Sequence, residues 1–186
     1  MQGRVDGQST QGILEGKMIT ELTDLSKLPL VCQLRAEAWE PDGILPPTVD
    51  EHEAHARHWI AFDGQRIIAA ARLCVHEQVI ELPEFELCPT SFEHYVGPFG
   101  SLNRMVVHPE ARGRGLAQQL DRLRLSTAIE MGCHTVVVST PQGRSRRLEA
   151  LGFMVVATFT HPCRTLPTAS SSEILWPSVL FVYHAY

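Results

Sequence analysis

The residues best suited to chemistry lie in one segment, Val107-His108-Pro109-Glu110-Ala111-Arg112-Gly113-Arg114-Gly115-Leu116-Ala117. Its apolar start predicts a strand, which Pro109 ends because proline cannot donate to a strand ladder. Gly113 and Gly115 allow a tight turn with inward-pointing backbone N–H groups. An amphipathic helix then begins near Leu116, and the positive end of its dipole attracts an anion to the same place as these amides. The segment therefore predicts a phosphate-binding turn between a strand and a helix.

The composition narrows what surrounds this turn. The chain has 186 residues, of which 44% are hydrophobic and 20% charged, which fits one compact domain with a core. Its formal net charge of -5 disfavours a general nucleic-acid binder. Against this acidic background, five arginines crowd near the turn and one later segment: Arg112, Arg114, Arg144, Arg146 and Arg147. A specific anionic ligand fits this pattern better than a polyanion.

Metal and membrane signals are missing from the sequence. The five cysteines have irregular spacing and no C-x-x-C pair, which suggests neither a disulfide framework nor a zinc site. His52, His55 and His58 lack supporting carboxylate spacing, so we predict no metal. Without a signal peptide or a long apolar run, a cytoplasmic protein that binds no membrane is expected.

The periodicity of apolar residues places the elements. Residues 1–17 are polar and predict a disordered leader, and residues 18–186 predict a single domain. Helices are expected over residues 26–40, 49–58, 116–131 and 143–151. Strands are expected over residues 66–75, 79–82, 101–108, 135–138, 153–160 and 179–184. The β-branched run at 135–138 predicts a strand in the centre of a sheet.

Arg112, Gly115 and Ala117 resemble the acyl-CoA-binding signature of the GNAT superfamily of N-acyltransferases. That signature is Gln or Arg, two variable residues, Gly, one variable residue, then Gly or Ala. Leu148-Glu149-Ala150-Leu151-Gly152-Phe153 is similar to the superfamily's later helix-to-strand junction. The resemblance covers about residues 20–186 in element order and 100–160 in motif detail.

The resemblance implies an α/β fold with three α/β/α layers and a central twisted mixed sheet, splayed beside the turn. It implies acetyl-CoA or another acyl-CoA as the donor. The CoA pyrophosphate would bind the turn amides, and the pantetheine arm would run beside the preceding strand. The implied binding residues are Met105, Val106, Val107, Arg112, Gly113, Arg114, Gly115, Leu116 and Ala117.

A second arginine group lies at the start of the predicted helix 143–151. Cations there oppose the helix dipole unless an anion is present. We therefore expect one of Arg144, Arg146 and Arg147 to meet the nucleotide phosphate of CoA, and we select Arg146 and Arg147 as binding residues, with an ordinary solvated face as the alternative.

The resemblance implies direct acyl transfer from CoA to an amine, which needs a base. Two residues depart from the superfamily pattern: Asn103 replaces a carboxylate, and Leu148 replaces a tyrosine. The base must then come from elsewhere, and loop 77–97 offers several groups: Glu81, Glu84, Glu86, Cys88 and His94. His94 is favoured because its unperturbed pKa lies near neutrality. We select His94, Glu84 and Asn103 as catalytic candidates, with a merely solvated acidic loop as the alternative.

Two other functions stay open. Without the usual proton-transfer residues, the fold could be an acyl-CoA sensor or partner-binding module. It could also use acyl carrier protein, as autoinducer synthases do, although the net charge offers no obvious dock for an acidic carrier. The acceptor, a small-molecule or protein amine, is not specified, and a homodimer through the final strands stays open.

Overall fold

The sheet that carries the candidate turn is seen in a computed structural model, which describes residues 12–14, 17–39, 49–141, 144–163 and 174–185. Over these residues, eight strands form one sheet in the order β1-β2-β3-β4-β5-β6-β8-β7. They are β1 (Gly12–Leu14), β2 (Lys17–Glu21), β3 (Arg57–Asp63), β4 (Arg66–His76), β5 (Phe99–Val107), β6 (Thr135–Pro141), β7 (Met154–Cys163) and β8 (Ile174–His184). Strands β5 and β6 pair in parallel and the other neighbours are antiparallel, so the predicted mixed sheet is confirmed.

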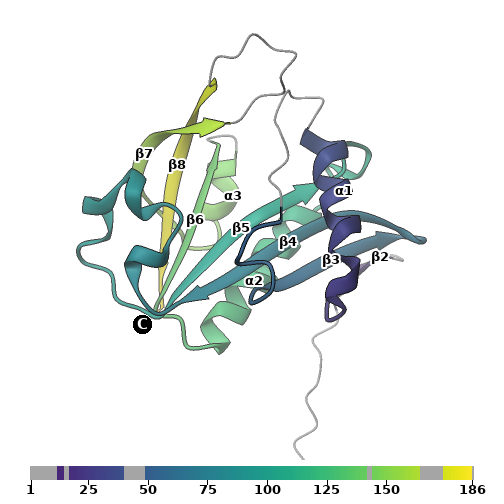
Figure 1. Cartoon of the computed structure of the whole chain (residues 1–186), viewed down its shortest axis with the longest axis horizontal. Coiled ribbons are helices and arrows are strands. Elements are labelled where there is room, and N and C mark those ends of the chain that lie inside the picture. The colour runs from purple at the N-terminus through teal and green to yellow at the C-terminus, as the bar shows by residue number, and fades with distance from the viewer. Residues whose placement is uncertain (1–11, 15–16, 40–48, 142–143, 164–173, 186) are drawn as a thin grey trace, which may run out of the picture.

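Helices cover both faces of this sheet (Figure 1). Helix α1 (Leu28–Trp39) and helix α2 (Leu116–Glu130) both contact β4 and β5, from opposite faces. Helix α2 and the short α3 (Ser145–Glu149) share one buried core, to which they contribute Leu120 and Leu148. Helix α1 packs a second core with Val31 and Leu34. The predicted three-layer α/β/α arrangement is therefore confirmed.

Two predicted elements are wrong. The helix expected over 49–58 is instead a set of turns followed by β3, in which Trp59, Ile60 and Ala61 are buried. The expected helix contained few apolar residues, and Val49 is exposed, so no apolar face stabilises a helix there. The strand expected over 79–82 is a 3₁₀ turn at Val79–Glu81.

The disordered leader predicted over residues 1–17 is only partly covered by the described residues. Residues 1–11 and 15–16 lie outside the described part of the chain. Residues 12–14 form β1, which pairs with β2.

Strand β5 has two irregularities that position the turn. It pairs with β6 only from Phe99 to Ser101, after which the two strands separate (Figure 1). On its other edge, the β4 partners change from Ala70 opposite Val106 to Arg72 opposite Asn103, so β5 holds one extra residue. This β-bulge includes Arg104, whose φ is 53°.

Among the described residues, no helix is long and apolar enough to cross a membrane. In the same part of the chain, no group of three or more His, Cys, Asp or Glu residues is arranged to hold a metal ion.

Candidate functional site

The turn between β5 and α2 leaves the first amides of the helix without a capping side chain. A 3₁₀ turn at Pro109–Ala111 follows β5, and Gly113 and Gly115 have φ values of 75° and 76°. Gly115 is the N-cap of α2 and makes no side-chain cap hydrogen bond. Helix N-terminal N–H groups have no partner within the helix, and the helix dipole favours an anion beside them. The geometry therefore suits the predicted phosphate.

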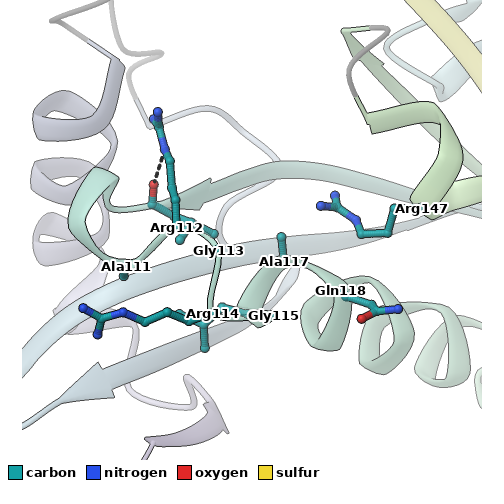
Figure 2. Close-up of a pocket in the computed structure, with 10 residues that line it drawn as sticks. Ala111, Arg112, Gly113, Arg114, Gly115, Ala117, Gln118 and Arg147 are labelled. Atoms are coloured by element: carbon teal, nitrogen blue, oxygen red, sulfur yellow. Dashed lines mark hydrogen bonds between the residues drawn. The ribbon is translucent and has the colours of Figure 1, made fainter.

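A cavity of about 270 Å³ lies against this turn (Figure 2). Its lining residues are Val107, Ala111, Arg112, Gly113, Arg114, Gly115, Leu116, Ala117, Gln118 and Arg147. Most of the predicted binding residues are thus brought together. Met105 and Val106 do not line this cavity, and the Val106 side chain is buried in the core beneath α1.

The turn arginines are directed away from the glycines (Figure 2). Arg112 Nε donates to the Val107 carbonyl at 3.4 Å, and Arg114 Nη1 lies 3.4 Å from Asp63 Oδ2. Both arginines are exposed. Of the two later arginines, Arg147 lines the cavity, whereas Arg146 is exposed and does not line it.

A buried carboxylate that the sequence analysis missed lies beside the cavity. Asp121 of α2 accepts hydrogen bonds from Arg124 Nη2 at 2.6 Å, Arg147 Nε at 2.9 Å and Arg144 Nη2 at 3.4 Å. Asp121 and Arg124 are fully buried. The signal for this pair was two charged residues, three apart, on the apolar face that includes Leu120 and Leu125.

Arg124 also fixes the bulge in β5. Its Nη1 donates to the carbonyl oxygens of Arg72 at 3.0 Å and Asn103 at 3.2 Å. A bulge leaves backbone groups without strand partners, and here a helix side chain supplies the donor. The path of β5 toward the turn therefore depends on α2.

The three predicted catalytic residues lie in different surroundings. Asn103 is held by its strand neighbours, because its Oδ1 accepts from Arg72 Nε at 2.6 Å and its Nδ2 donates to Ser101 Oγ at 3.1 Å. Glu84 is buried, and its Oε1 accepts from Ser139 Oγ at 2.7 Å. His94 is exposed in a turn. Through this hydrogen bond, Glu84 contacts β6 beyond the point where β5 separates from it.

A second charged cluster, also missed, lies on the α1 side of the sheet. Arg72 and Arg104 each donate to a different oxygen of Asp50 at 2.6 Å, and Arg35 donates to Glu53 at 2.7 Å. Burial raises the pKa of Asp50, but the hydrogen bonds from both arginines lower it to about 2. This cluster joins α1, the 49–56 segment and strands β4 and β5.

Comparisons with known proteins agree with this architecture. The profile of the acetyltransferase (GNAT) family matches residues 23–153. A search of curated protein sequences gave no match. Among similar solved structures, FeeM, an N-acyl amino acid synthase from uncultured soil microbes, has 12% identity and a TM-score of 0.67, covering 94% of this chain and 92% of that chain.

Two further structures have the same fold. The Drosophila melanogaster polyamine N-acetyltransferase, which forms N-acetylagmatine, has 16% identity and a TM-score of 0.61, covering 90% of this chain and 100% of that chain. The protein yncA from Salmonella typhimurium, solved with its cofactor acetyl-CoA, has 14% identity and a TM-score of 0.63, covering 91% of this chain and 94% of that chain.

Proposed function

Because the chain belongs to the GNAT acetyltransferase family, we propose that it transfers an acyl group, expected to be acetyl, from CoA directly to the amine of a small molecule. The observation that carries this proposal is the uncapped start of α2 beside the cavity. Its backbone amides and helix dipole suit a pyrophosphate. The pantetheine arm would run back along β5 toward Met105.

The gap between β5 and β6 suits the thioester. Beyond Ser101, the β5 edge that faces β6 is not paired with it, so strand amides there can polarise a thioester carbonyl. Glu84, which contacts Ser139 on β6, is the candidate that can take a proton from an amine held at this gap. A covalent route through Cys74 is disfavoured because burial raises the pKa of its thiol.

The donor half of the proposal can be tested with a Gly115→Glu variant. A carboxylate at the start of α2 would repel the pyrophosphate, and we expect calorimetry to show CoA affinity reduced at least about tenfold, or roughly 1.4 kcal/mol. Gly132→Glu is the matched control, because Gly132 has a φ of 83° at the opposite end of the same helix. It carries the same backbone strain and charge but should bind CoA normally. Equal affinities in the two variants would contradict the proposed donor site.

The acceptor half needs a panel of amines. Two of the proteins with similar structures are a polyamine N-acetyltransferase and an N-acyl amino acid synthase. Agmatine, polyamines and amino acids are therefore the first acceptors to test. With acetyl-CoA, release of free CoA in the presence of one amine would support the reaction. Tight acyl-CoA binding with no turnover for any amine would instead indicate a binding module.

A further inference from the structure

The group around Asp121 holds more positive than negative charge. We call Asp121, Arg124, Arg144 and Arg147 the arginine cluster. Three guanidiniums share one carboxylate, which leaves two positive charges in excess. Asp121 and Arg124 are fully buried, and the side chains of Arg144 and Arg147 keep only 26% of their exposure. Partly desolvated charges of one sign are unfavourable without a counter-charge.

Two nitrogen atoms of the arginine cluster also lack hydrogen-bond partners among the described residues. They are Arg144 Nε and Arg147 Nη2, and both are buried. A buried donor without an acceptor is energetically unfavourable. Burial lowers the pKa of Arg144 to about 10, although Asp121 opposes this effect, so the group stays charged at neutral pH. The cluster therefore has both charge and donors available for an anion.

The arginine cluster borders the cavity at the turn. Arg147 is a lining residue, and Figure 2 shows its side chain extending from α3 toward the start of α2. Arg144 Nη2 lies 3.7 Å from Met105 Sδ, on the strand that leads into the turn. Arg147 thus lies on the wall of the same cavity as the Gly113–Gly115 backbone, whereas Arg144 does not line this cavity and lies beside Met105.

We infer that Arg144 and Arg147 form a side-chain subsite for the diphosphate of the donor, and that Asp121 holds them in place until the donor binds. This inference rests on the proposed function. The two excess positive charges equal the two negative charges of a pyrophosphate diester. Backbone amides would hold this group from the α2 side and guanidiniums from the α3 side, and arginine suits phosphate oxygens because its donors form a fork.

Arg147→Gln tests this subsite, with Arg122→Gln as its control. Arg122 is exposed on α2, next to Asp121, and does not line the cavity. We expect Arg147→Gln to weaken CoA binding about tenfold or more, since glutamine cannot form charged hydrogen bonds to the phosphate oxygens. Arg122→Gln should stay within about twofold of the wild type. Equal CoA affinities in the two variants would overturn the inference.

The ligand can be varied to separate phosphate binding from a purely structural role. We expect Arg147→Gln to lose the same factor for CoA and for 3′-dephospho-CoA, because both contain the diphosphate. With the phosphate-free thioester acetyl-S-N-acetylcysteamine, kcat/KM should match the wild type. A loss confined to CoA would assign Arg147 to the 3′-phosphate, and an equal loss with the phosphate-free thioester would show that Arg147 only supports the fold. Both results would overturn the inference.

Arg144→Gln supplies a second variant if Arg147→Gln does not fold. A loss for CoA and 3′-dephospho-CoA, relative to Arg122→Gln, would support the subsite, and no loss would overturn it. If the wild-type protein itself binds no CoA, the proposed function fails. If the wild type binds CoA and both arginine variants bind it equally well, only the present inference fails.

Discussion

At the scale of single residues, Glu84 is the strongest candidate for the base. It is buried and contacts Ser139 beyond the end of the β5–β6 pairing, whereas His94 is exposed. We expect Glu84→Gln to lower kcat/KM about 10²–10⁴-fold, because the amide keeps its shape but cannot accept a proton. Glu93→Gln, an exposed change in the same loop, should stay near wild-type activity, and similar rates in both variants would exclude Glu84.

Sequence reasoning located residues whose role depends on local geometry. Gly113 and Gly115 have the positive φ values that the tight turn required. Glycine adopts such values readily, so the two positions could be recognised from the sequence alone. Asp121 was not found, because its hydrogen-bond partners Arg144 and Arg147 lie on another helix. Asn103 was assigned a catalytic role, and its hydrogen bonds to Arg72 and Ser101 could be learned only from the strand register.

At the scale of elements, helix α2 and the bulge in β5 depend on each other through Arg124. We expect Arg124→Met to destabilise the protein by about 3–5 kcal/mol, because Asp121 loses a buried partner and the two bulge carbonyls lose their donor. Chemical denaturation would measure this loss. Arg122→Met, on the exposed face of the same helix, should change stability by less than about 0.5 kcal/mol. Comparable losses in the two variants would show that Arg124 does not support the bulge.

The elements that were predicted correctly have strong local signals. Helix α2 has a regular apolar face, and β6 has a β-branched run that is buried on both sides. The segment before β3 has neither signal, and the strand itself is defined by its antiparallel pairing with β4, from Arg57 opposite Leu73 to Asp63 opposite Arg66. A partner that lies further along the chain cannot be inferred from the periodicity of the segment alone.

At the scale of the whole molecule, buried histidines make stability depend on pH. Burial lowers the pKa values of His58 and His76 in the folded protein. Below the unfolded value of about 6.5, the unfolded chain therefore binds more protons, and the free energy of unfolding falls as the pH decreases. We expect the denaturation midpoint to decrease as the pH is lowered from 7.5 to 5.5.

A His58→Gln variant tests this explanation. It should show a smaller decline than the wild type over the same pH range, since one of the two imidazoles whose pKa is lowered by burial is gone. His94→Gln changes an exposed histidine and should keep the wild-type decline. An unchanged decline in His58→Gln would show that protonation of His58 does not drive the loss of stability.

The overall architecture could be predicted because the segment 107–117 has the sequence signals of a strand, a turn and a helix in that order, and this motif resembles one known family. The layers and the mixed sheet then followed from the resemblance. The separation of β5 from β6 was also expected, but its starting point at Ser101 and Val137 depends on pairing that no local pattern encodes.

The position of β8 affects how the protein is made. Among the described strands it comes last in chain order, yet it lies between β6 and β7 in the sheet. On the ribosome, a chain synthesised as far as Cys163 would expose edges of both β6 and β7, because their shared partner has not yet emerged. Unpaired edges promote aggregation. The interval between synthesis of β7 and β8 is therefore when the nascent protein most needs protection.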